Sequence, residues 1–327
     1  MPEMNMIQAI SSALRHALAA DERVVVFGED VGKFGGVFRA TDGLQAEFGE
    51  DRVFDTPLAE GGIIGTAVGM AAYGMRPVPE IQFADFIFPG FDQIVNEAAK
   101  LRYRSGGQYT CPLVIRTPYG GGIRGGLYHS QSPEALFIHV QGLKVVVPSN
   151  PSDAKGLLTA AIADPDPVLF FEPKRIYRAA KGEVAEESYE VPLGKAAIAR
   201  AGSDVTILAW GAALHDCMTA ADELAAAGTS CELVDLRTLV PLDVDTIVQS
   251  VKKTGRCVIV HEAPKTAGFG GELAATVQEH ALSWLSAPIL RVTGYDTPFP
   301  HALEMEYLPS PARIRAGVES VMSYEFA

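Results

Sequence analysis

Residues 55–74 read DTPLAEGGIIGTAVGMAAYG and predict a helix of small and apolar side chains. Gly61, Gly65 and Gly69 recur every four residues, which places them on one face of that helix. Each glycine costs a helix interior about 1 kcal/mol relative to alanine. We therefore expect another part of the structure to approach this face closely.

Glu60 stands at the front of this helix, without an obvious basic partner nearby in the sequence. Two interpretations are open. In the first, Thr56 caps the helix, Pro57 takes its first position and the acid interacts favourably with the helix dipole. In the second, the carboxyl group takes part in chemistry inside an apolar pocket, where its neutral form is favoured.

Length and charge bound the class of protein. A chain of 327 residues can form two domains with full-sized cores. The formal net charge of −13 argues against nucleic acid or an anionic membrane as a partner. No run of eighteen apolar residues is present, and the N-terminus MPEMNMIQAISSALRHALAAD lacks the basic leader and cleavage site of a signal peptide.

The cysteines are widely scattered and form no metal-type pair. Free thiols in a reducing cytoplasm are the simplest interpretation, and we expect a cytoplasmic protein. The four positions are Cys111, Cys217, Cys231 and Cys257.

Strand-like and helix-like segments alternate along the chain, which predicts an α/β fold of two doubly wound parallel-sheet domains. The polar stretch KRIYRAAKGEVAEESYEVPLG is interpreted as the linker, giving domains at 1–180 and 190–327. The expected strands are RVVVFGED, RPVPEIQF, CPLVIRTP, LKVVVPS and DPVLFFEP, then SDVTILAWG, TSCELVDLRT, GRCVIVHEA and APILRVTG. The expected helices include 91–104, 152–163, 213–227, 243–252 and 271–284.

The stretch GGGIRG at 120–125 matches a dinucleotide fingerprint, G-x-G-x-x-G, and follows a predicted strand. However, GLYHSQSPEA comes next in place of an apolar helix, and no acid stands at the expected distance. We therefore expect a flexible, closely approached active-site loop and no nicotinamide site.

Several long motifs together resemble one family. They are GEDVGKFGGVFRAT, DTPLAEGGIIGTAVGMA, EIQFADFIFPGFDQIVNEAAKLRYRSGG, YHSQSPEA, VVVPSNPSDAKGLL, FFEPKRIYR, VDLRTLVPLD and GYDTPFPHALE. The chain resembles, nearly end to end, the β subunit of the thiamin-diphosphate-dependent 2-oxo acid dehydrogenases, the branched-chain type most of all. The resemblance implies a thiamin pyrimidine-binding domain followed by a transketolase C-terminal-type domain.

The resemblance gives Glu60 a catalytic role, hydrogen-bonded to N1′ of the thiamin aminopyrimidine. Removal of the C2 proton by the 4′-imino group requires a protonated N1′, and a carboxylic acid in an apolar pocket can share that proton. Phe86, in FADFIF, matches the position whose ring packs on the aminopyrimidine, where relatives often carry tyrosine. Leu58 flanks the same ring in the family. An ordinary core phenylalanine is the alternative for Phe86.

His129, in GLYHSQSP, is the second predicted catalytic residue. It follows the glycine-rich stretch and precedes Ser130 and Gln131, which could orient its ring. Because imidazole titrates near neutrality, it can deliver a proton. The resemblance assigns it to the reductive acylation of a lipoyl group, and a structural loop histidine is the alternative.

The resemblance also implies a potassium ion held by backbone carbonyl groups, as suits a hard cation. Val114 has no hydroxyl group where relatives often carry threonine. The matching positions are Leu113, Val114, Ala161, Asp164 and Asp166.

A metal–diphosphate motif, G-D-G followed by asparagine about thirty residues later in the family, is missing from this sequence. The chain therefore carries half of a thiamin diphosphate site. The resemblance implies that an α subunit supplies the magnesium-binding half, in a heterotetramer of two α and two β chains. A lipoyl-bearing acyltransferase is the expected further partner, and the glycine face of residues 61–69 is expected at a subunit interface.

The expected activity is oxidative decarboxylation of branched-chain 2-oxo acids with acyl transfer to the lipoyl group. Pyruvate or acetoin are alternatives within the same class. A non-catalytic scaffold subunit is the alternative from another class, and the joint presence of Glu60, Phe86 and His129 argues against it.

Overall fold

The computed structural model describes residues 1–325 and divides into two compact units. Unit 1 comprises Met1–Tyr119 and Leu136–Leu193. Unit 2 comprises Gly120–Ala135 and the chain from Gly194 onward. The chain thus makes an excursion into unit 2 before it completes unit 1, which a single division at 180–190 does not include.

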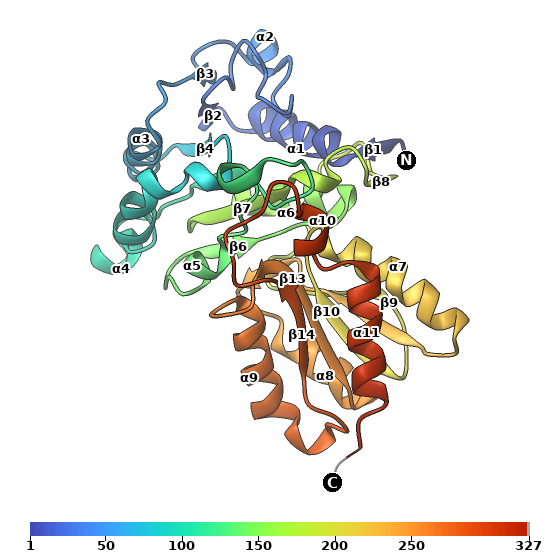
Figure 1. The fold of residues 1–327 in the computed structure, drawn as a ribbon. Helices are drawn as coiled ribbons and strands as arrows, with labels where there is room; N and C mark the ends of the chain where they lie inside the picture. Colours follow the sequence, from blue (N-terminus) through green and yellow to red (C-terminus); the bar gives the residue numbers. More distant parts are fainter. Residues whose placement is uncertain (326–327) are drawn as a thin grey trace. The chain divides into compact units, whose positions relative to one another are not determined.

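Unit 1 is built on a parallel sheet whose strands run in the order β6-β7-β5-β4-β2-β3 (Figure 1). The register sets Val26 opposite Val53, and Gly28 opposite both Asp55 and Glu80. Strands β2 and β7 are buried along their whole length, as expected for parallel strands covered on both faces. The strands are β2 (Val24–Gly28), β3 (Val53–Asp55), β4 (Arg76–Glu80), β5 (Val114–Tyr119), β6 (Lys144–Val146) and β7 (Val168–Pro173), with a separate antiparallel pair of β1 (Glu3–Asn5) and β8 (Lys181–Glu183).

Two helices of the first half begin at clear sequence signals. Asn5 and Gln8 form a capping box at the first helix, and Asn150 followed by Pro151 begins the helix that packs against it. The helices are α1 (Met6–Ala20), α2 (Leu44–Phe48), α3 (Glu60–Ala72), α4 (Leu101–Arg104), α5 (Glu134–Ile138) and α6 (Pro151–Ala163). Shorter turns are η1 (Ala84–Phe86), η2 (Phe88–Gly90), η4 (Gly126–Tyr128) and η5 (Lys174–Ile176), and η3 (Gln93–Ala98) is π-helical.

Unit 2 has a five-stranded sheet in the order β14-β13-β10-β11-β9, in which only the edge strand β9 is antiparallel. Its helix α8 is capped by Asp243 and ends at Gly255 in the left-handed conformation. The strands are β9 (Ala197–Arg200), β10 (Val205–Ala209), β11 (Cys231–Asp235), β12 (Thr238–Val240), β13 (Cys257–Pro264) and β14 (Leu290–Gly294). The helices are α7 (Ala213–Ala226), α8 (Val244–Thr254), α9 (Phe269–Ala281), η6 (Leu282–Trp284), α10 (Glu304–Tyr307) and α11 (Pro311–Met322).

The predicted fold class is confirmed, because both units are α/β with mostly parallel sheets. Two local predictions are wrong. The expected helix at 91–104 is interrupted, since π-helical η3 gives way to the short α4. The segment interpreted as a linker is folded in its first part, where Tyr177 and Val184 are buried and β8 pairs with β1.

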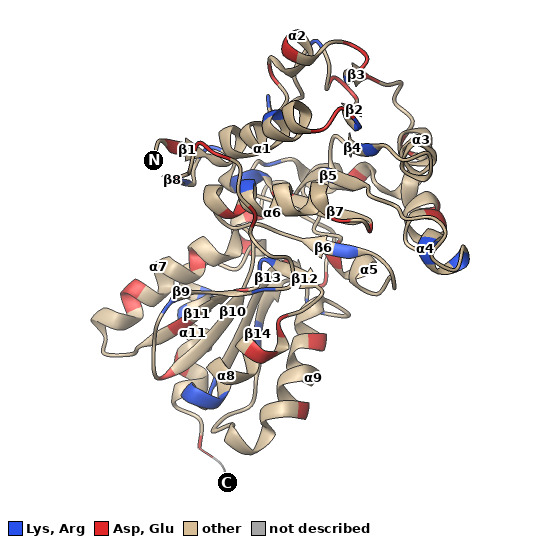
Figure 2. Ribbon diagram, turned by 180° about the vertical axis from the view of Figure 1, so that it is seen from behind, with Lys and Arg blue, Asp and Glu red and all other residues tan. Residues whose placement is uncertain are grey.

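Charges of both signs are distributed over both units (Figure 2). Acidic residues mark α7 and α9, while Arg102 and Arg104 lie on α4. All four cysteines are free, as predicted, and all four are buried. Within residues 1–325, none of the helices has the length and apolar character that crossing a bilayer requires.

Candidate active site

Glu60 is the first residue of α3 and is buried, with 7% of its surface exposed. The helix is capped by Ala59, without a side-chain hydrogen bond, so the prediction that Thr56 caps it and Pro57 begins it is wrong. Within residues 1–325, the Glu60 carboxylate has neither a hydrogen-bonding partner nor a counter-ion. A buried carboxylate left in this way is available to a ligand, because isolated buried polar groups are costly unless they are paired.

The glycine face of α3 meets the same chain at its N-terminal end. A Cβ atom on Gly61 would lie 3.0 Å from the carbonyl oxygen of Pro89, and one on Gly65 would lie 3.6 Å from Cγ of Gln93. A Cβ on Gly69 would meet nothing within 4 Å. The close approach predicted for this face is therefore intramolecular at Gly61, where η2 packs against α3. A subunit interface along residues 61–69 stays a prediction, since this face is open at Gly69.

Glu29 is a second buried acid of unit 1, directly after β2. Burial, together with the negative charges of Glu60 and Asp30, raises the pKa of Glu29. Its Oε1 atom has no hydrogen-bonding partner among the described residues. Glu29 was not among the residues predicted for the site, although an acid directly after a buried strand, in FGED, could have indicated it.

Phe86 ends η1 and is half-buried, and its ring contacts Phe83 edge-on with centroids 5.7 Å apart. Phe83 also meets Phe38 at 5.5 Å. Leu58, by contrast, is 79% exposed. Phe86 is therefore held by an aromatic cluster, while Leu58 projects from the chain just before α3.

A buried charge network lies within the sheet of unit 1, at β4, β5 and β7. Arg116 is fully buried and donates two hydrogen bonds to Glu172, at 2.7 and 3.1 Å, and one to Glu80 at 3.0 Å. Tyr177 donates to Glu172 at 2.6 Å. One guanidinium thus faces two carboxylates, and burial with the charges of Glu172 and Glu29 raises the pKa of Glu80 to about 7, although Arg116 opposes the shift.

The glycine loop, residues 120–126, is bound by two buried carboxylates of unit 2. Glu304 accepts hydrogen bonds from the backbone N–H groups of Gly122 at 2.7 Å and Arg124 at 2.9 Å. Glu262 accepts one from Gly121 at 3.1 Å. Loops with alternating backbone conformations form such anion-binding concavities. In the GGGIRG loop these anions are carboxylates of the protein itself. The close approach predicted for this loop is confirmed at Gly121, and its flexibility stays a prediction.

His129 follows this loop and is partly exposed at the end of η4. A backbone hydrogen bond joins the chain before and after His129, since the N–H of Gly120 donates to the carbonyl oxygen of Gln131 at 2.9 Å. The Gln131 side chain donates to the carbonyl oxygen of Leu127. His129 belongs to unit 2, whereas Leu58, Glu60 and Phe86 belong to unit 1.

A further acid follows His129 in the chain. Glu134 is buried, and burial with the negative charge of Glu262 raises its pKa to about 8, although a hydrogen bond from Trp210 opposes the shift. Trp210 stacks on His261 at 5.3 Å, and burial lowers the pKa of His261 to about 4. His261 is therefore a neutral group of the core of unit 2.

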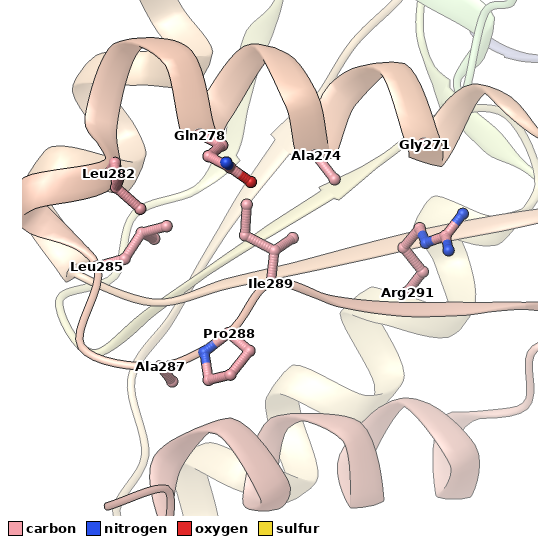
Figure 3. A pocket seen from close by; sticks show the side chains of 9 residues that line it. All are labelled: Gly271, Ala274, Gln278, Leu282, Leu285, Ala287, Pro288, Ile289 and Arg291. Carbon is pink, nitrogen blue, oxygen red and sulfur yellow. The ribbon is translucent and has the colours of Figure 1, made fainter. Parts of the chain in front are cut away.

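Two cavities of unit 2 differ in chemistry. One of about 430 Å³ is lined by the η4 region, by Glu262 and by Tyr307. Another, of about 670 Å³, lies between α9 and β14; most of its lining is apolar, and Arg291 lies at one end of it (Figure 3). Of these two cavities, only the first has an acid, Glu262, in its lining. Its lining also includes Tyr128, which precedes His129 in the sequence.

The five predicted potassium positions lie around the start of β5 and the end of α6. The Leu113 carbonyl accepts a hydrogen bond from Val168, and Arg76 donates to the carbonyl of Asp164. Lys144 pairs with the carboxylate of Asp164 at 2.5 Å. These carbonyl groups retain a second lone pair, whereas the nearby cations compete with a metal ion.

Two family models match the chain. The transketolase pyrimidine binding domain matches residues 2–180, and the transketolase C-terminal domain matches residues 194–314. A solved structure described as a split gene transketolase, inactive beta4 tetramer, has the same fold, with a TM-score of 0.80 at 24% identity over 98% of both chains.

Curated relatives are similar over almost the whole length. The 2-oxoisovalerate dehydrogenase subunit beta of Pseudomonas aeruginosa is 55% identical over 98% of this chain and 95% of its own. That of Bacillus subtilis is 50% identical over 99% of this chain and all of its own. The pyruvate dehydrogenase E1 component subunit beta of Bacillus subtilis is 51% identical with the same coverage.

Proposed function

This chain belongs to the transketolase-fold β subunits of the 2-oxo acid dehydrogenases, and from that premise we propose that it is the β half of an enzyme that decarboxylates branched-chain 2-oxo acids. Relatives described as 2-oxoisovalerate dehydrogenase β subunits, at 50–56% identity, support this substrate class. Pyruvate is the second candidate, because one relative at 51% identity is a pyruvate dehydrogenase subunit.

The buried, unpaired Glu60 carboxylate carries the proposal. Thiamin diphosphate, when bound, supplies the carbanion chemistry that decarboxylation needs. We assign Glu60 to hold a proton at N1′ of the aminopyrimidine, since an acid with no partner among residues 1–325 can share one there. Phe86 would pack on the same ring, held in place by Phe83, and Leu58 would flank it from its exposed position.

His129 is assigned to proton delivery in acyl transfer to the lipoyl group of a partner acyltransferase. Its partial exposure and its fixed loop suit a group that must meet a large substrate. A scaffold subunit would need neither an unpaired buried acid nor a histidine held in this way.

The sequence lacks the G-D-G motif, so we propose that an α subunit binds the diphosphate and magnesium, in an assembly of two α and two β chains. Potassium is proposed at the carbonyl groups of Leu113, Val114, Ala161, Asp164 and Asp166, as a structural ion with no role in a chemical step. The free, buried cysteines suit a reducing cytoplasm.

Co-expression with the α subunit tests the proposal. Decarboxylation of 2-oxoisovalerate and pyruvate is measured with an artificial electron acceptor, and lipoyl-domain acylation is measured separately. We expect activity in the assembly, with 2-oxoisovalerate preferred, and none from the β chain alone. Activity of the isolated β chain with thiamin diphosphate and magnesium would contradict the half-site, and an inactive assembly would favour the scaffold.

A further inference from the structure

The glycine loop has an unusual anchor in Glu304, a residue that the proposed chemistry leaves without a role. Glu304 is the first residue of α10 and only 3% of its surface is exposed. Its two carboxylate oxygens accept separate hydrogen bonds from the N–H groups of Gly122 and Arg124. Both bonds are charge-assisted, which makes them stronger and more directional than bonds between neutral groups.

The backbone of the loop is shaped for this contact. Gly120, Gly122 and Gly126 have φ angles of +82°, +93° and +65°, and Arg124 has +56°. Arg124 is a non-glycine residue in the left-handed region, a conformation that persists where the surroundings hold it. The hydrogen bond from the Arg124 N–H to the Glu304 carboxylate stabilises this conformation.

The outer side of the loop is exposed and partly apolar. Ile123 is 40% exposed, Leu127 is 47% exposed and Tyr128 is 68% exposed. On the inner side, a Cβ on Gly121 would lie 2.6 Å from the ring of Phe299, so the backbone rests directly on the core of unit 2. The loop is therefore fixed from within and presents its side chains outward.

We propose that Glu304 is a positioning residue that sets the location of His129. Arg124, bound to Glu304, precedes the histidine by five residues, and Gln131, bound to Gly120, follows it by two. His129 thus lies between two fixed points. Glu262 binds the same loop at Gly121, but it also lines the cavity beside η4. A substitution of Glu304 therefore tests the loop contact without changing the lining of that cavity. The proposal rests on the role of His129 proposed above.

The test uses Glu304→Gln in the enzyme assembled with its α subunit. The amide can accept one of the two hydrogen bonds, while its NH₂ group faces the other N–H. Tryptic cleavage after the exposed Arg124 is expected to accelerate several-fold. The rate at which diethylpyrocarbonate modifies His129, read by peptide mass spectrometry against His215, is expected to change. Glu306→Gln, on the exposed side of the same helix, is the matched control and should change neither rate.

The activity readout is selective. We expect Glu304→Gln to lower lipoyl-domain acylation by about 100-fold, since a displaced catalytic group costs about that much, while artificial-acceptor decarboxylation changes by less than about twofold. Combined with His129→Ala, it should cause no further loss. Glu304→Asp keeps the charge on a shorter arm and should give intermediate rates, which retains a readout if the glutamine variant folds poorly.

Unchanged cleavage and unchanged His129 modification would overturn the proposal. Fully additive losses in the double variant would also overturn it, because Glu304 would then act independently of the histidine. A third outcome is that His129→Ala alone spares acylation, while Glu304→Gln still changes the rates of tryptic cleavage and of His129 modification. Glu304 would then position His129 as proposed, and the proposed role of His129 in acyl transfer would be wrong.

Discussion

Glu80→Gln is expected to change how the stability of unit 1 depends on pH. Glu80 shares the single guanidinium of Arg116 with Glu172, which holds it through two hydrogen bonds. When both carboxylates are ionised, this buried site contains one more negative charge than positive charge. Burial, followed by the charges of Glu172 and Glu29, raises the pKa of Glu80 from 4.5 to about 7, against the opposing effect of Arg116.

Because the pKa of Glu80 is raised in the folded protein, the free energy of unfolding falls as pH rises. Between pH 4.5 and 7 the folded protein binds a proton at Glu80 that the unfolded chain releases, so this contribution to stability is complete below pH 4.5 and is lost as pH rises through 7. A shift of this size corresponds to about 3 kcal/mol. Glutamine can still accept the hydrogen bond from Arg116 but carries no charge at any pH. The variant should equal the wild type near pH 4.5 and exceed its stability by up to about 3 kcal/mol at pH 8.

Urea-dependent hydrogen exchange in the assembled enzyme provides the assay, followed on peptides that cover β4 and β5. Glu22→Gln, at an exposed position of the same unit, is the control and should show no pH-dependent difference. A constant difference in unfolding free energy between Glu80→Gln and wild type from pH 4.5 to 8 would refute the reasoning, because Glu80 would then be ionised equally in both states.

Three further predictions concern the proposed function. Glu60→Gln should lower proton exchange at C2 of bound thiamin diphosphate by about 100-fold or more without impairing assembly, and wild-type exchange would return Glu60 to a structural role. His129→Ala should lower acylation of a lipoyl domain by about 100-fold while decarboxylation with an artificial acceptor stays within about twofold, and an equal fall in both assays would show a role in substrate binding or loop order instead. Replacing potassium by sodium at constant ionic strength should lower the melting temperature of the assembly by a few degrees, corresponding to about 1 kcal/mol, and equal melting temperatures would argue against the ion.

Local patterns in the sequence were sufficient for the architecture and for the two predicted catalytic residues as candidates. Buried apolar runs of strand length, separated by helical segments, predicted parallel sheets in both units, and the structure confirms them. Glu60 drew attention as an acid before an apolar helix, and His129 as a histidine after a glycine-rich loop. Strands and helices can be predicted from short stretches of sequence, because the side chains that each buries recur with the period of the strand or helix.

Tertiary structure alone decided which groups meet. Helix α3 begins at Glu60 and not at Pro57, and η2 packs against it. Glu304 binds N–H groups that lie 180 and 182 residues earlier, and Arg116 finds its carboxylates 36 and 56 residues away. A local period carries no information about such pairings. They arise because burial forces each charge and each loop N–H group to find a partner wherever the packed sheets and helices bring one within hydrogen-bonding distance.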